Sequence, residues 1–411
     1  MSKFQTWLPP CLLIALLSQG KAAALSDAAK ADELLAKYQA FVAEFESVRF
    51  DSDTTTYQKG GPFAEWTWVV TSHAAFSRKG DRWRFLIHEV GYNYYDHKKI
   101  PFDLETEQTF DGRSYFMVDR DDREARELPE IDETSARQRL AGHLGRRVET
   151  QASAEIDTEK PAAARDYAVQ NETCLFYGYI PGDRVSIIDL FHDKRSRLTA
   201  GADALGGRTC DILRGATSHG VITLWLDRES NHIPIRILIR RSGDDLVGNT
   251  PMRKQKPHGD DKRVMPNLPM LGYDIDAEFK HSTIGGQDTI SGCLREDRFT
   301  FERGVTYGRR IEMNLTRVDF NPKPEDLEPT LAIPEGNYVS IRNAPGIAAK
   351  WSGGKLVMNY DKPTVAALKA NWVSEEIPTP AWRRPIVLTT TVLLIIAVSL
   401  LARRLIVKRV E

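Results

Sequence analysis

The chain has few of the features that mark several common protein classes. Its 411 residues include 4 cysteines, and 56 lysines and arginines balance 57 acidic residues, with no long basic run. A net charge of -1 argues against a protein that binds nucleic acid by neutralising phosphates. Proline and glycine are too few for a disordered chain, and the 41% of apolar residues can build a core. We expect one or two globular units.

Metal-binding motifs are also missing. The 9 histidines contain no His-Glu-x-x-His motif and no pair at i, i+4 spacing. Asp119, Asp121 and Asp122 resemble the start of a calcium loop, but Glu124 stands where the tight turn of an EF-hand needs glycine. We therefore expect no metal site and no cofactor.

Nucleophile motifs are equally weak. The nearest approach to a hydrolase elbow, at residues 112–116, lacks its second glycine and lies in a predicted hairpin. Cys210 has Asp211 and His219 nearby, but alternation along a strand sends Cys210 and Asp211 to opposite faces. We expect no catalytic residues and no enzyme, and keep an exported hydrolase as a minor alternative.

The N-terminus has the pattern of a secretory signal. Lys3 precedes the apolar run Cys11–Leu17, and small residues at Ala22–Ala24 supply a cleavage site. An uncleaved anchor is the alternative, but so short an apolar run cannot span ~30 Å of hydrocarbon. The sequence predicts a signal peptide over 1–24.

The C-terminal region has the pattern of one membrane crossing. Residues 385–402 carry no charge, and eighteen residues at ~1.5 Å each reach ~27 Å. A buried core helix is the alternative. Two arginines precede the segment and four basic residues follow it, which places the C-terminus in the cytoplasm. We predict a single-pass membrane protein with an exported domain at 25–340, on the periplasmic or extracellular side. A juxtamembrane segment (341–384), a transmembrane helix (385–402) and a cytoplasmic tail (403–411) follow.

The mature chain would keep three cysteines. Cys174, Cys210 and Cys293 lack the C-x-x-C spacing of redox and metal sites. In an exported chain we expect one disulfide and one buried thiol. Cys174 and Cys210, both in strand-like segments, are the expected pair, and the sequence leaves the connectivity open.

The exported part begins with an amphipathic helix and continues in strands. Apolar residues recur at helical spacing from Leu34 to Val48, which predicts a helix docked by one face. From residue 60 the period becomes that of strands. Lys79-Gly80-Asp81 and Asp111-Gly112 are the turns of two predicted hairpins.

Later segments extend the β pattern. Strands near 208–213, 221–227 and 233–240 predict a meander, and further strands are expected at 275–281, 299–301 and 310–320. The charged, alanine-rich residues 119–165 predict one or two helices, and 248–269 predict a long surface loop. Beyond Pro334 we expect loops and one helix at 364–371.

This order of motifs resembles the LolA-like superfamily of exported lipoprotein-localisation and outer-membrane lipoprotein-sorting proteins. The resemblance rests on Gly206-Gly207-Arg208-Thr209-Cys210, Leu224-Trp225-Leu226-Asp227 and Ala332-Ile333-Pro334-Glu335-Gly336, and covers roughly residues 30–340. It implies an α+β fold: a curved, open, antiparallel half-barrel sheet with helices on its concave side, where acyl chains bind. The predicted span and the long insertions distinguish this chain from soluble carriers of that family.

The functional expectation follows from the curved sheet. A concave face with many inward aromatic residues either holds an apolar guest or fills with its own side chains. The candidate cleft residues are Trp66, Trp68, Trp83, Phe85, Tyr115 and Trp225. We expect an envelope protein that binds a lipid or a lipidated partner without catalysis. A dry core and a sensor or scaffold that binds protein partners are the alternatives.

Overall fold

The computed structural model describes most of the chain between residues 10 and 358. The residues described are 10–80, 82–95, 98–110, 115–121, 131–142, 154–157, 174–181, 183, 185–255, 267–284, 287–328, 335–336, 338–341, 348–352 and 355–358. The chain divides into two units, Met1–Leu356 and Val357–Glu411. The described helices and strands belong to the first unit, apart from Val357 and Met358 at the end of the last strand.

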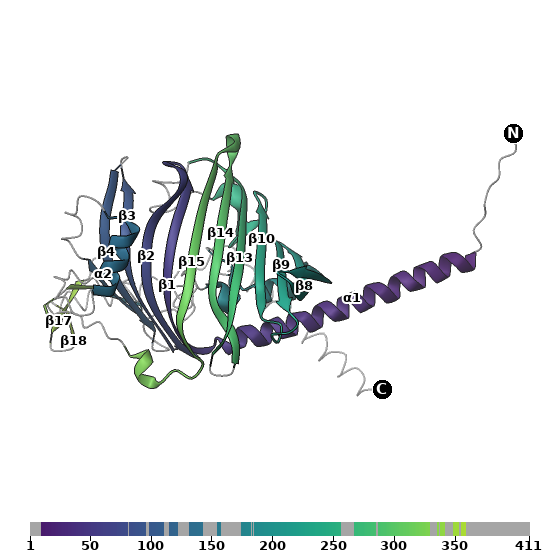
Figure 1. Ribbon diagram of the computed structural model, residues 1–411, viewed down its shortest axis with the longest axis horizontal. Coiled ribbons are helices and arrows are strands. Elements are labelled where there is room, and N and C mark those ends of the chain that lie inside the picture. The colour runs from purple at the N-terminus through teal and green to yellow at the C-terminus, as the bar shows by residue number, and fades with distance from the viewer. Residues whose placement is uncertain are drawn as a thin grey trace, which may run out of the picture. The chain divides into compact units, whose positions relative to one another are not determined.

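One large sheet dominates this unit (Figure 1). Its strands run in the order β18-β17-β16-β6-β5-β4-β3-β2-β1-β15-β14-β13-β10-β9-β8-β7. Neighbours are antiparallel except for the parallel pair β6 and β16, and β18 and β7 form the two ends. The strands are β1 (Ser47–Gly60), β2 (Phe63–Lys79), β3 (Arg82–Tyr95), β4 (Lys98–Phe110), β5 (Tyr115–Asp121), β6 (Ala154–Asp157), β7 (Arg197–Leu205), β8 (Arg208–Thr217), β9 (Gly220–Asp227), β10 (Pro234–Ser242), β13 (Met270–Ile284), β14 (Gln287–Phe301), β15 (Thr306–Asp319), β16 (Tyr338–Ile341), β17 (Ala348–Ser352) and β18 (Lys355–Met358).

Helices and short turns complete the unit. The helices are α1 (Pro10–Glu44), α2 (Glu133–Gly142) and α4 (Ile187–His192), and the 3₁₀ turns are η2 (Cys174–Tyr177), η3 (Met252–Lys254), η4 (Glu302–Gly304) and η5 (Pro324–Leu327). A two-residue hairpin, β11 (Leu246–Val247) with β12 (Thr250–Pro251), stands apart from the main sheet.

One face of the sheet, here the inner face, carries the main core. Buried residues of α1, including Tyr38 and Phe45, pack with η2 and α4 against alternate strand residues such as Phe50 and Phe76. The rings of Phe50 and Phe76 stack with their centroids 5.3 Å apart, and those of Phe45 and Phe176 lie 6.0 Å apart. The amphipathic pattern of the N-terminal helix is therefore explained by burial of one helix face.

The opposite, outer face carries a smaller core under α2. Ile131 and Ala136 pack there with Val90 of β3, and Trp68 of β2 lies against them. The pairing of β1 with β2 shifts between Thr56 and Tyr57, and such a bulge changes which side chains of a strand point to each face. The fold expected from the resemblance has its helices on the concave side, whereas α2 covers the outer face.

Several predictions are confirmed. The sheet is antiparallel apart from one pair and is not closed. Both predicted hairpins pair as β2 with β3 and β4 with β5, and the meander pairs as β8, β9 and β10.

Other predictions need correction. The helix ends at Glu44 and Val48 already lies in β1, a long strand that the sequence analysis missed because its second half is polar. Residues 119–165 contain α2 but also the end of β5 and strand β6, and β16 to β18 follow where loops were expected. The segment 248–269 includes β12 and η3.

The described helices include none that is both long and apolar enough to cross a membrane. The predicted span at 385–402 and the predicted helix at 364–371 lie outside the described residues. Cleavage of the signal peptide after Ala24, a position inside α1, stays a prediction.

Candidate functional site

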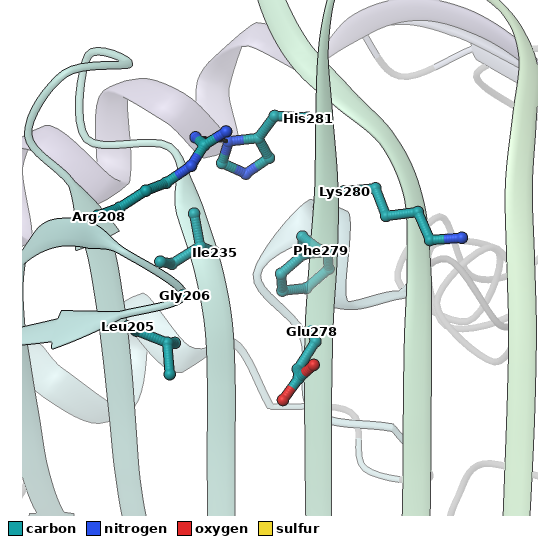
Figure 2. Close-up of a pocket in the computed structure, with 8 residues that line it drawn as sticks. All are labelled: Leu205, Gly206, Arg208, Ile235, Glu278, Phe279, Lys280 and His281. Atoms are coloured by element: carbon teal, nitrogen blue, oxygen red, sulfur yellow. Dashed lines mark hydrogen bonds between the residues drawn. The ribbon is translucent and has the colours of Figure 1, made fainter.

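A pocket of about 390 Å³ opens where the β7–β8 turn meets β10 and β13 (Figure 2). It combines three apolar side chains with two cations, an imidazole and a carboxylate. The lining residues are Leu205, Gly206, Arg208, Ile235, Glu278, Phe279, Lys280 and His281.

Strand ends create this pocket. Gly206 and Gly207 have φ angles of 60° and 81°, the left-handed conformation that a two-residue hairpin turn requires. The turn pairs Leu205 directly with Arg208 and brings both side chains to the hairpin tip. β10 begins at Pro234, whereas β13 continues to Ile284, so His281 extends past the start of its neighbouring strand.

A buried carboxylate holds Arg208 in place. One terminal nitrogen of its guanidinium, Nη1, lies 2.5 Å from Oδ2 of Asp227, which is fully buried. Burial alone would raise the pKa of Asp227, but hydrogen bonds from the Glu229 backbone N–H and from Arg208 outweigh it and lower the pKa. Asp227 is therefore ionised, and Arg208 is oriented by a charge-assisted bond.

His281 contacts the same nitrogen of Arg208. Its Nε2 lies 3.1 Å from the Pro234 carbonyl, which can only accept a hydrogen bond, so Nε2 carries the proton of the neutral ring. Nδ1 then accepts from Nη1 of Arg208 at 3.4 Å. Burial is the main cause that lowers the pKa of His281, and Arg208 lowers it further. The neutral ring is thus the form that the pocket favours.

The rest of the lining is apolar in the middle and charged at the rim. Figure 2 shows Ile235 and Phe279 between the Arg208–His281 pair and the Glu278 carboxylate. The ammonium group of Lys280 points away from Arg208 in the same view. A ligand in this space would meet hydrogen-bond donors at one end and apolar carbon in the middle.

The predicted cleft residues do not gather in one place. Trp83 and Phe85 are 3% and 7% exposed and belong to the inner core. Trp68 packs near α2 on the outer face and donates from Nε1 to Thr71 at 2.9 Å. None of the five predicted residues whose side chains the structure describes lines the pocket.

Two further tryptophans of that set stack against arginines outside the inner core. The guanidinium carbons of Arg310 and Arg236 lie 4.7 Å and 5.2 Å from the ring centroids of Trp66 and Trp225. The side chain of Tyr115 lies outside the described residues. The five described members therefore divide between two faces and do not form one inner cleft.

The disulfide predicted between Cys174 and Cys210 is not formed in the structure. Cys174, Cys210 and Cys293 are all buried and none of them forms a disulfide. Cys174, in η2 instead of a strand, and Cys293 belong to the inner core, whereas Cys210 does not. Alternation along β8 explains this, because Leu213 points into the inner core and Cys210 therefore faces the other side.

No pattern in the sequence marks Arg208 and His281 as a pair. The Gly206-Gly207 turn was visible and placed Arg208 at a hairpin tip. His281 stands 73 positions later, and no local pattern connects the two residues.

The side chains of Arg208 and His281 in the site are already hydrogen-bonded within the protein. Both ring nitrogens of His281 have hydrogen-bond partners, so it cannot take a proton without losing its bond to Arg208. Across the described parts of the chain, no group of three His, Cys, Asp or Glu side chains is arranged to hold a metal ion.

Comparisons with known proteins identify no relative by sequence. No family model matches the chain, and a search of curated proteins finds no match. Among solved structures, a DUF1329 family protein from Desulfovibrio piger ATCC 29098 is similar at 10% identity, with a TM-score of 0.27, over 70% of this chain and 91% of that one. A similarity of this size carries no argument about fold or function.

Proposed function

We propose that this protein is a non-catalytic ligand-binding module, exported and anchored by a C-terminal span. The observation that carries the proposal is the pocket between the β7–β8 turn and β13, in which an oriented guanidinium faces apolar side chains. Small-molecule sites combine apolar walls with a few fixed polar groups in this way.

The size and position of the pocket also limit the kind of ligand that it can hold. Its volume of about 390 Å³ lies at the lower end of the ~300–1,000 Å³ of typical sites. On the inner face, the largest side chains, among them Tyr38, Phe50 and Phe76, are fully buried in a packed core. We therefore place the ligand in the pocket beside the β7–β8 turn. We expect this ligand to be a small amphiphile or one part of a lipid.

Export and anchoring rest on the sequence. The signal pattern at 1–24 and the uncharged segment at 385–402 support an envelope protein with its binding domain outside the cytoplasm. In this arrangement the pocket would meet ligands of the envelope.

Equilibrium dialysis of the full chain in detergent micelles tests the binding proposal. The probes are 1-naphthaleneacetate and its neutral amide, 1-naphthaleneacetamide, each with a flat apolar ring. Leu205→Trp should fill the pocket and remove the binding of any probe that the unchanged protein retains above a protein-free micelle blank.

Leu271→Trp is the matched control. Leu271 is 47% exposed and does not line the pocket, so this variant should bind as the unchanged protein does. The proposal fails if neither probe binds, or if both tryptophan variants bind equally well.

A protein scaffold is the second candidate function. β7 ends the sheet, and no further strand pairs with it among the described residues. Such an edge can accept a strand from a partner protein. Failure of both probes to bind would favour this alternative.

A further inference from the structure

We propose that the pocket selects ligands with an anionic group, a carboxylate, sulfonate or phosphate monoester, attached to an apolar body. The anionic group would bind Arg208, and the apolar body would lie on Ile235 and Phe279. This inference rests on the proposed function and adds the chemical class of the ligand.

The guanidinium of Arg208 has hydrogen-bond donors that a ligand can reach. Asp227 and His281 both contact Nη1 of its guanidinium. For Nε and Nη2, no partner is found within the described part of the chain. The side chain is 46% exposed, so these donors are accessible. A planar guanidinium presents them in a fork that matches two oxygens of one anionic group.

The pocket is organised before a ligand arrives. Asp227 is fully buried, and the backbone N–H of Glu229 donates to its other oxygen, Oδ1, at 3.0 Å. This carboxylate therefore has a fixed position and fixes Arg208 in turn. A ligand group that meets a pre-oriented donor loses less entropy on binding, which increases affinity.

Selection comes from the direction of the donors and not from an excess of positive charge. Arg208 is balanced by Asp227, and the rim holds one carboxylate, Glu278, and one ammonium, Lys280. Because the Lys280 ammonium points away from Arg208, it adds little to an anion bound there. A charge-assisted bond is roughly twice as strong as a neutral one, so an anionic group should bind better than its neutral isostere.

The same pair of probes tests the class of ligand. 1-Naphthaleneacetate and 1-naphthaleneacetamide share one ring and differ in charge. We expect the carboxylate to bind about tenfold more tightly, the ratio that one additional charge-assisted bond supplies.

Two variants assign this preference to Arg208. Arg208→Lys keeps a cation beside Asp227 but loses the planar fork, so binding of the carboxylate should fall about tenfold while the amide is unaffected. Lys280→Gln removes a charge from the rim and should change carboxylate binding by less than about twofold, as expected of an exposed ion. Equal urea midpoints for the variants and the unchanged protein establish that the fold is retained.

The outcomes separate this inference from the proposed function. Equal binding of the two probes, lost in Leu205→Trp, overturns the anion preference and leaves the binding module intact. A loss confined to Lys280→Gln, or an equal loss of both probes in Arg208→Lys, also overturns it. Failure of both probes to bind the unchanged protein removes the proposed function itself.

Discussion

At the scale of single residues, Asp227 shows how one buried carboxylate organises a site. It lies at the last position of β9, where a buried charge must be compensated. Arg208 and the Glu229 backbone supply the compensation. The cost of burying Asp227 is thus offset by the same contacts that orient the pocket.

Protonation of His281 should weaken the fold in mild acid. Its pKa is lowered in the folded protein, so between the unfolded value of ~6.5 and the lower folded value the unfolded chain binds the proton more readily. Stability is therefore complete above pH ~6.5 and falls as the pH drops below it. Urea midpoints between pH 7.5 and 5.5 should fall less steeply for His281→Asn than for the unchanged protein.

His219 also has a lowered pKa, and burial is the main cause. Part of the fall of the urea midpoint with pH should therefore remain in His281→Asn. Identical slopes for His281→Asn and the unchanged protein would contradict the role given to His281.

The thiols provide a second prediction at this scale. We expect labelling of the denatured, unreduced protein to modify Cys174, Cys210 and Cys293, because all three are buried and none is disulfide-bonded. In the folded protein Cys210 should react slowly, since burial, as the main cause, raises the pKa of its thiol. Peptide mass spectrometry after labelling measures the modification of each cysteine in the denatured protein and the rate at which Cys210 reacts in the folded protein. A pair of cysteines that resists labelling until reductant is added would refute this prediction.

At the scale of elements, α2 is held by a local outer core. Asp132 accepts a hydrogen bond from the Ser135 backbone N–H at 2.7 Å, and this bond is the main cause of the lowered pKa of Asp132. Ala136 is fully buried between the helix and the sheet. The helix is therefore held by this cap, by its packing on β2 and β3, and by hydrogen bonds of Glu133, Arg137 and Arg139 with side chains of β1 and β4.

Ala136→Asp should release α2 and leave the pocket side of the sheet intact. Burial of a carboxylate there costs roughly 1–3 kcal/mol or more, which the small outer core can offset only in part. Hydrogen exchange should accelerate in 133–142 and stay unchanged in β8 to β10, with Ala136→Ser as the milder control. Uniform acceleration over the whole sheet would show that α2 is not an independent element.

At the scale of the whole molecule, the proposed membrane topology rests on two independent sequence signals. These are the signal-peptide pattern at 1–24 and the basic residues on either side of 385–402. A reporter that is active only in the cytoplasm should work when fused after Glu411 and fail when fused at Lys323. The basic residues after 402 outnumber those just before 385, which favours a cytoplasmic C-terminus. Activity at Lys323 with none after Glu411 would reverse the proposed orientation.

Local sequence determined much of the sheet. Gly80 at the β2–β3 turn and the Gly206-Gly207 pair have positive φ angles that glycine tolerates, so these hairpins could be placed in advance. Alternation also placed Cys210 and Asp211 on opposite sides of β8 correctly. These features depend on neighbours in sequence, which is why a pattern of period two reveals them.

Tertiary structure decided the rest. β1 carries buried polar residues such as Ser52 and Thr54, so its strand character comes from pairing with β2 and β15 and not from an apolar pattern. A bulge in the β1–β2 pairing, invisible in composition, accompanies the packing of Trp68 on the outer face. Arg208 and His281 meet because β9 ends at Asp227 and β10 begins at Pro234, whereas β13 continues past this level to Ile284. Strand length and register are set by long-range pairing, and the sequence alone does not specify them.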